Sequence, residues 1–178
     1  FERVAVLVRD IQSALARART LEDIETSVCE RLADADPYVF AWIGATDTDS
    51  PRVTPKASAG KEAGYFDVVE ITADDSPTGQ GPTGRALKTR STHVVQNISV
   101  DPTYGPWREP ALERNYRSSA AIPIQYDDTL YGVLNVYASH PKAFDSDERS
   151  LLEDLCETVA HAYHRIRLQN QYESQYQE

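Results

Sequence analysis

The sequence predicts an α+β fold in which a mostly antiparallel sheet carries helices from both chain ends on one face. Three observations favour it. Apolar residues recur at helical spacing at both ends of the chain. Beyond Pro37 the pattern changes to runs of β-branched and aromatic residues. Two of these runs, residues 118–126 and 130–137, are separated by only three residues, as in a hairpin.

The chain begins with two expected helices. The first carries the apolar stripe Val4, Val8, Ile11 and Leu15, and the second carries Leu21, Ile24, Val28 and Leu32. Thr20 has the side chain of a helix N-cap, and the acidic Glu22 and Asp23 suit the first turn that follows it. Pro37 closes the segment that ends the second helix.

The middle of the chain alternates strands with irregular segments. Residues 38–44 are nearly all apolar, as in a strand that is covered on both faces, and residues 52–59 predict its hairpin partner. Residues 61–72 fit either a helix or a strand. The remaining expectations are a loop over 74–84, a helical turn over 85–88, a short strand over 92–96 and a connection over 97–115.

A long helix closes the chain. Asp145 or Ser146 is its expected N-cap, with Glu148 in the capping-box position. Its apolar seam consists of Leu152, Leu155, Val159, Ala162 and Ile166. We expect this seam and the first helix to pair between two chains in a homodimer. Residues 168–178 are expected to extend the helix beyond the globular body.

Composition excludes several classes of protein. The 178 residues include 28 Asp and Glu against 18 Lys and Arg, which gives a net charge of −10. Such a surface is a poor partner for nucleic acid, whose affinity rests on Lys and Arg. No apolar run is long enough to span a membrane, and no signal peptide opens the sequence, so we expect a cytoplasmic domain. The absence of Met indicates a segment of a longer polypeptide.

Lysine is scarce among the basic residues, with four lysines in the total of 18. An acidic, lysine-poor surface suits a cytoplasm of very high salt, where screening removes charge repulsion. An ordinary acidic bacterial domain is the alternative interpretation.

No motif in the sequence supports an enzyme or a metal site. Residues 79–84 match G-x-G-x-x-G, but the helix expected after Gly84 is too short for a dinucleotide-binding unit. His161 and His164 share a helix face without a third metal ligand. Cys29 and Cys156 fall inside helices and have no redox spacing. We therefore expect a protein that is not an enzyme, and its cofactor, if it has one, stays unknown.

Large aromatic residues gather in the irregular middle of the chain: Tyr65, Phe66, Tyr104, Trp107 and Tyr116. Loops with large aromatic residues often build ligand pockets over one face of a sheet. The same residues would equally well fill that face as a second hydrophobic core. Periodicity alone leaves both interpretations open.

A series of short motifs resembles the GAF domain family. The series consists of residues 81–87 (GPTGRAL), Asp101-Pro102, residues 116–124 (YRSSAAIPI), residues 130–136 (LYGVLNV) and residues 143–148 (AFDSDE). The resemblance implies a central antiparallel sheet of five to six strands, with the terminal helices on one face and ligand-pocket connections on the other. It also implies a domain over residues 20–167, preceded by a linker or dimerisation helix over 1–19.

Within the family, the acidic composition is most similar to the GAF modules of bacterio-opsin-activator-type regulators of halophilic archaea. The resemblance implies a sensory module that binds a small molecule or dimerises, with DNA contacted by a separate helix-turn-helix domain. The implied pocket residues are Phe40, Trp42, Tyr65, Phe66, Thr83, Tyr104, Trp107, Arg117 and Ser119. The cyclic-nucleotide signature, a bilin-binding cysteine and the cysteines of the methionine-sulfoxide-reducing members are not reproduced. A ligand-free dimerisation scaffold and, less favoured, an enzyme of unknown chemistry remain the alternatives.

Overall fold

The computed structural model describes residues 2–176 and has the predicted α+β architecture. Its centre is a five-stranded sheet in the order β2-β1-β5-β4-β3, in which every neighbouring pair is antiparallel. The strands are β1 (Tyr38–Thr46), β2 (Val53–Gly60), β3 (His93–Val95), β4 (Ser118–Tyr126) and β5 (Thr129–Ala138). This topology excludes the parallel dinucleotide-binding unit that the glycine pattern superficially matches.

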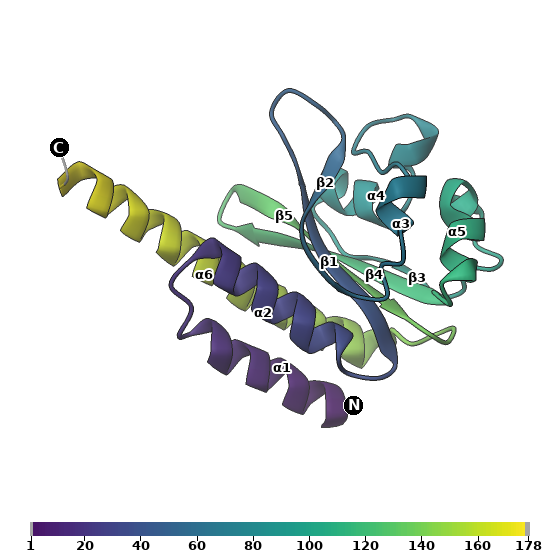
Figure 1. Cartoon of the computed structure of the whole chain (residues 1–178), viewed down its shortest axis with the longest axis horizontal. Coiled ribbons are helices and arrows are strands. Elements are labelled where there is room, and N and C mark those ends of the chain that lie inside the picture. Colours follow the sequence, from purple (N-terminus) through teal and green to yellow (C-terminus); the bar gives the residue numbers. More distant parts are fainter. Residues whose placement is uncertain (1, 177–178) are drawn as a thin grey trace.

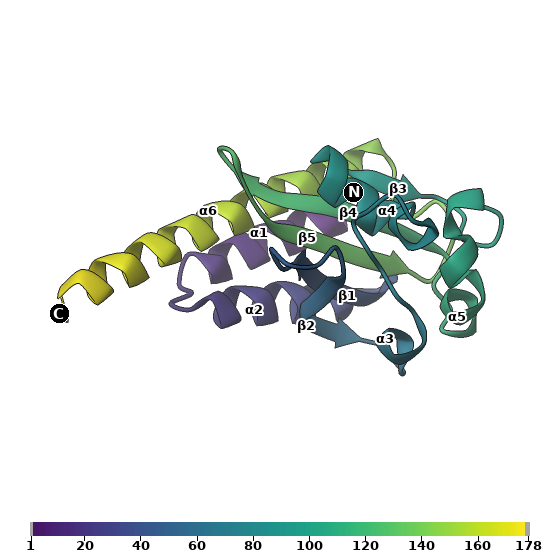
Figure 2. The ribbon, with the colours of Figure 1, turned by 90° about the horizontal axis from the view of Figure 1, so that it is seen from above.

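Two helices, α2 (Leu21–Ala33) and α6 (Ser146–Tyr176), cover one face of the sheet, and α1 (Glu2–Leu15) packs on these two helices from outside, as Figures 1 and 2 show. The predicted N-cap of α2 is confirmed, because Thr20 Oγ1 accepts a hydrogen bond of 3.0 Å from the Asp23 amide. The Asp23 carboxylate accepts one of 3.2 Å from the Thr20 amide, which completes a capping box.

The apolar seams of α1 and α6 are buried within one chain. Val4, Ile11 and Leu15 are at most 1% exposed, and they belong to the same core as Leu152 and Val159 of α6. The expectation that these two seams pair between chains is therefore wrong. The reason is that the seam of α6 covers the sheet and the seam of α1 packs against α2 and α6 within the protomer.

The start of α6 also differs from the expected capping box. Asp145 is the N-cap, since its Oδ1 accepts a hydrogen bond of 2.9 Å from the Glu148 amide. The Glu148 carboxylate does not return to the helix end. It accepts a hydrogen bond of 2.7 Å from the hydroxyl of Tyr38 on β1 and so fastens α6 to the sheet.

Short helices and loops cover the opposite face of the sheet (Figure 2). They are α3 (Tyr65–Val68), the 3₁₀ helix η1 (Pro77–Gly79), α4 (Pro82–Thr89), the 3₁₀ helix η2 (Pro102–Trp107) and α5 (Arg108–Glu113). Residues 82–84, expected as loop, form the first turn of α4, where Pro82 suits a helix start. The expected connection over 97–115 likewise contains two short helices. We call these segments the loop face.

Helix α6 continues past the body of the domain, and its C-terminal end projects from it in Figure 1. Of the expected extension over 168–178, residues 177 and 178 lie outside the described residues. Among the helices of residues 2–176, none combines the length and apolar character that a membrane-spanning helix needs.

Candidate functional site

A second core lies between the sheet and the loop face, and aromatic rings dominate it. Phe40 of β1 stacks on Tyr116 with ring centroids 5.6 Å apart and on Tyr137 of β5 at 5.4 Å. The indole Nε1 of Trp42 donates a hydrogen bond of 2.9 Å to the Tyr137 hydroxyl. Because β1 and β5 are neighbours, their inward-facing rings form one continuous layer under the loops.

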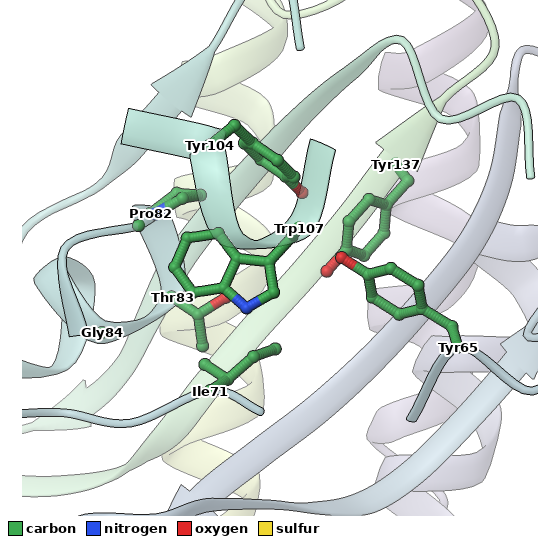
Figure 3. A pocket seen from close by; sticks show the side chains of 9 residues that line it. Tyr65, Ile71, Pro82, Thr83, Gly84, Tyr104, Trp107 and Tyr137 are labelled. Carbon is green, nitrogen blue, oxygen red and sulfur yellow. The ribbon is translucent and has the colours of Figure 1, made fainter. Parts of the chain in front are cut away.

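A small, narrow cavity, which we call the inner cavity, lies between this layer and the loop face. The space between its atoms is about 230 Å³, of which about 10 Å³ is open to the centre of a water molecule. That is the space that a single buried water requires. The residues that line it, shown in Figure 3, are Tyr65, Ile71, Gly81, Pro82, Thr83, Gly84, Tyr104, Trp107 and Tyr137.

The Trp107 ring forms one wall of the inner cavity and is held in place from two sides. Its Nε1 donates a hydrogen bond of 2.7 Å to the Glu70 carbonyl. Its six-membered ring lies against Gly81, where a Cβ atom would come within 2.4 Å of the ring. Glycine at this position therefore allows the indole to lie flat on the start of α4.

Three tyrosine hydroxyls converge at one side of the inner cavity. Those of Tyr65 and Tyr137 meet in Figure 3, and that of Tyr104 points towards them. Burial raises the pKa of Tyr65 and Tyr137 well above the ordinary value and that of Tyr104 to about 12. All three phenols are therefore protonated and uncharged at neutral pH.

Two further buried polar groups lie on this face of the sheet. Thr83 of α4 donates a hydrogen bond of 2.7 Å from its hydroxyl to Asn135 Oδ1 of β5, which holds α4 against the sheet. Ser119 lies directly across from Tyr137 in the β4–β5 register and beside Tyr104. Among the buried side-chain oxygens and nitrogens of residues 2–176, its hydroxyl alone makes no hydrogen bond of regular geometry, and the Tyr104 hydroxyl is the group that lies next to it.

A second pocket of about 140 Å³, the outer pocket, adjoins the inner cavity. Ile71 lines both, so this side chain separates the two spaces. The aromatic residues of the outer pocket are Trp42 and Phe66, and its exposed residues include Arg52 and Glu70. A shift of Ile71 would join the outer pocket to the inner cavity.

A comparison of the sequence with models of protein families identifies the family of this chain. The model of the GAF domain family matches residues 18–164, which is most of the chain. The chain belongs to the GAF domain family. The short motifs of the sequence, the antiparallel sheet and the position of the cavity under the loop face agree with this assignment.

Two curated relatives of this GAF domain are regulators from halophilic archaea. The Bacterioopsin transcriptional activator of Halobacterium salinarum is 28% identical over 159 residues, which cover 89% of this chain and 22% of the relative. A protein of Haloferax volcanii named "Putative transcriptional regulator" is 27% identical over 157 residues, which cover 88% of this chain and 25% of the relative. The chain thus spans a quarter or less of these relatives' length.

Solved structures share the fold of this GAF domain. The GAF domain of a phosphoenolpyruvate-protein phosphotransferase from Coxiella burnetii has a TM-score of 0.75 and 20% identity, over 95% of this chain and 97% of that one. The free methionine-R-sulfoxide reductase of Neisseria meningitidis, solved with its substrate, has a TM-score of 0.74 and 20% identity, over 91% and 89% of the two chains. At this identity the likeness concerns the fold alone.

The structure places the nine expected pocket residues in four different ways. Tyr65, Thr83, Tyr104 and Trp107 line the inner cavity, and Trp42 and Phe66 line the outer pocket. Phe40 and Ser119 are buried in the layer beneath, without lining either space. Arg117 lines neither, because its Nε donates to Asn115 Oδ1 at 3.1 Å at the entry to β4.

The sequence-based set missed five residues of the inner cavity: Ile71, Gly81, Pro82, Gly84 and Tyr137. Gly81, Pro82 and Gly84 stand in the GPTG motif that carried the family resemblance, so that motif was the available signal. Tyr137 lies in a strand that is apolar on both faces, where alternation does not tell which side faces a pocket. Within residues 2–176 no group of three or more His, Cys, Asp or Glu is arranged to hold a metal ion.

Proposed function

We propose that this GAF domain is the sensory input module of a cytoplasmic transcription regulator and that a small molecule binds in its inner cavity. The observation that carries the proposal is the cavity itself, which is narrow, aromatic and uncharged, with the Ser119 hydroxyl in the layer beneath it. Buried polar groups without partners are rare in native proteins and call for an explanation. A ligand that enters the opened cavity and reaches this hydroxyl is such an explanation.

The inner cavity has to open before it can take anything larger than water. A ligand that binds only an open arrangement of the loop face would shift the population towards it, at the expense of the closed arrangement. A ligand with equal affinity for both arrangements would change nothing. We propose that helix α6, which runs under the sheet and projects from the body, carries the change to another part of the regulator. DNA contact is assigned to that other part, because the net charge of this chain is −10.

We infer further that this GAF domain is not an enzyme of the reductase type. Cys29 and Cys156 belong to the core on the helix face of the sheet, away from the inner cavity. Burial raises the pKa of Cys29 to about 12 and that of Cys156 still further, so both thiols are protonated at neutral pH. A protonated, buried thiol is a poor nucleophile.

A ligand-free dimerisation scaffold is the second candidate, and the nearly filled cavity favours it. A homodimer through the terminal helices would use surfaces other than the two buried seams. Leu168 of α6 is 52% exposed and lines an open groove between α1 and α6 with Ala16 and His164. A monomeric mass in molar salt at every concentration tested would exclude this candidate, and Leu168→Glu should dissociate a dimer formed there.

Native mass spectrometry tests the sensory proposal. The domain is expressed in a halophilic archaeon, purified without denaturation and weighed before and after unfolding. We expect an additional small mass that unfolding releases and that Gly81→Ala protein lacks, because a Cβ at residue 81 forces Trp107 out of its place. If native protein that has been exposed to cell extract has only the mass of the chain itself, the result would favour the scaffold instead.

A further inference from the structure

We infer that the inner cavity is selective for an uncharged ring that carries one hydroxyl, the class of a simple phenol. This inference rests on the proposed sensory function and adds the chemistry of the ligand. Charge, shape, hydrogen bonding and size each restrict the ligand, and the four restrictions agree.

The lining of the inner cavity excludes a charged ligand. None of its nine residues is ionised at neutral pH, since the three tyrosines remain protonated. Arg114, whose guanidinium lies 5.7 Å from the centre of the Tyr65 ring, donates its hydrogen bonds to the carbonyls of Ala63 at 2.8 Å and Pro110 at 2.9 Å. A buried ligand charge would thus have no counter-ion, which costs several kcal/mol.

Shape follows from the walls. Trp107 presents its indole, Tyr104 packs against it edge-to-face with centroids 5.7 Å apart, and Gly81 contributes only backbone. Aromatic walls of this kind favour a ring that stacks on one face and meets another ring at its edge. A flat ligand therefore fits, whereas the tetrahedral backbone of an amino acid finds neither shape nor charge to match it.

One hydrogen-bonding group on the ligand is required. The hydroxyls of Tyr65, Tyr104 and Tyr137 converge at one side of the inner cavity, and the unpartnered Ser119 lies beside them. A hydroxyl both donates and accepts, so a single ligand hydroxyl satisfies the mixed demands of this cluster. A purely apolar ring would cover the tyrosine hydroxyls that line the cavity without giving them a hydrogen bond, at the cost of buried polar groups that the ligand does not satisfy.

The size of the ligand is limited by the space that becomes available when the Ile71 side chain moves. Ile71 separates the inner cavity from the outer pocket of about 140 Å³. An engineered cavity of about 150 Å³ in another protein binds benzene. The space that forms when Ile71 moves and the inner cavity joins the outer pocket therefore suits a single ring. The charged residues Arg52 and Glu70 lie exposed at the outer pocket, towards solvent. The charged residues therefore lie at the solvent side of the outer pocket, and the lining of the inner cavity stays uncharged.

Fluorine NMR with three matched probes tests the inference on the full chain in molar KCl at pH 7. The probes are 4-fluorophenol, fluorobenzene and 4-fluorobenzoate, which differ only in the group that meets the hydroxyl cluster. We expect saturable binding of 4-fluorophenol that is at least about tenfold tighter than that of 4-fluorobenzoate, equivalent to about 1.4 kcal/mol. Fluorobenzene should lie between them. Tighter binding of 4-fluorobenzoate, or equal binding of all three, would overturn the inference.

Matched variants place the binding in the inner cavity. Gly81→Ala should abolish 4-fluorophenol binding, because its Cβ would lie 2.4 Å from the Trp107 ring. Gly105→Ala, in the helical segment that carries Tyr104 and Trp107, meets nothing within 4 Å and should bind like the wild type. Tyr104→Phe, which removes one hydroxyl from the lining of the inner cavity, should remove most of the preference for 4-fluorophenol over fluorobenzene. An unchanged preference would contradict the role of the hydroxyl cluster even if Gly81→Ala failed to fold.

Failure of this inference is distinguishable from failure of the sensory proposal. A charged molecule released in the native mass experiment would leave the sensory proposal standing and overturn the phenol class. No released molecule together with no binding of 4-fluorophenol would overturn both. A released neutral hydroxylated ring, with the expected order of the three probes, would support both.

Discussion

At the scale of single residues, the clearest contrast is in the hydrogen bonding of two neighbouring serines of β4. Ser118 and Ser119 are both at most 2% exposed, but they face opposite sides of the sheet. Ser118 donates a hydrogen bond of 2.8 Å to the His140 carbonyl, and Ser119 has no partner in the described part of the chain. The Ser118 hydroxyl therefore stabilises the fold, and under the proposed function the Ser119 hydroxyl bonds to a ligand once the cavity opens.

This contrast gives the first prediction, on the free energy of unfolding without ligand. Ser118→Ala should lower it by about 1 kcal/mol through the lost hydrogen bond, whereas Ser119→Ala should leave it unchanged or raise it slightly. Urea denaturation of the two variants in the same salt measures both. A larger loss of unfolding free energy for Ser119→Ala than for Ser118→Ala would mean that the Ser119 hydroxyl has a hydrogen-bond partner within the protein, and would contradict its proposed bond to a ligand.

At the scale of elements, the loop face packs on the sheet through the aromatic second core and a few buried hydrogen bonds. The bond from Thr83 to Asn135 joins α4 to β5, and the bond from Trp107 to the Glu70 carbonyl joins η2 to the segment before η1. The helix face, in contrast, is held by a continuous apolar core. Opening of the inner cavity should therefore disturb the loop face and leave the helix face intact.

The second prediction concerns the join between α4 and β5. Thr83→Val keeps the shape of the side chain but leaves Asn135 Oδ1 buried without its donor. We expect the free energy of unfolding to fall by about 1–3 kcal/mol. Thr129→Val, at an exposed position of β5, is the matched control and should change it by less than about 0.5 kcal/mol. Equal effects of the two substitutions in urea denaturation would contradict the assigned role of Thr83.

The elements that the sequence predicts well are those with a regular apolar pattern. The stripe of Val4, Val8, Ile11 and Leu15 predicts α1 correctly, and the caps and strands follow from Thr20 and from residues 38–44. The loop face is harder to predict because its short helices lack a period. Pro82 lies inside α4 although the glycine-rich segment around it predicts a loop. Pro82 at the first helical position is a local signal for this helix start, but the glycines on either side of it favour a loop equally well.

The candidate site could be predicted only in part for the same reason. Aromatic residues in irregular segments indicate a pocket, and Tyr65, Tyr104 and Trp107 do line one. Arg117 and Ser119 stand in the same motif, but neither lines the cavity: Arg117 bonds to Asn115, and Ser119 is buried in the layer beneath. Which residue of such a motif faces the cavity depends on how β4 enters the sheet, and local sequence does not determine that.

At the scale of the whole molecule, the buried tyrosines predict a loss of stability in alkali. The pKa of Tyr104 is raised to about 12, and those of Tyr65 and Tyr137 are raised well above the ordinary value of 10. Above pH 10 the unfolded chain therefore releases protons that the folded chain keeps, so the free energy of unfolding falls as the pH rises. Below pH 10 these groups add no pH dependence.

Urea midpoints at pH 8, 10 and 11 measure this third prediction, with tyrosinate absorbance recorded alongside. We expect a midpoint that is steady to about pH 10 and then falls, with the last tyrosines ionising only as the chain unfolds. Return to pH 8 should restore the midpoint. Ionisation of all tyrosines in the folded protein near pH 10 would show that the aromatic layer is open to solvent.

The fourth prediction follows from the net charge of −10 on 178 residues. Mutual repulsion of surface carboxylates destabilises the folded state at low ionic strength, and salt screens it over about 10 Å at 0.1 M and about 3 Å at 1 M. The thermal midpoint should rise between these two KCl concentrations. NaCl should act equally, and an uncharged osmolyte at the same osmolality should not substitute for either salt. A midpoint that is independent of salt would contradict a salt-adapted surface.

The central claim is that a ligand enters the inner cavity under the loop face, and the two tryptophans test it most directly. The chain has only Trp42 and Trp107, which line the outer pocket and the inner cavity, respectively. Their indole N–H groups bond to different acceptors, the Tyr137 hydroxyl and the Glu70 carbonyl, so proton–nitrogen NMR gives two separate signals. On titration with 4-fluorophenol we predict a saturable shift of the Trp107 signal that Gly81→Ala abolishes and Gly105→Ala retains. Saturation of the probe with both indole signals unmoved would contradict the claim.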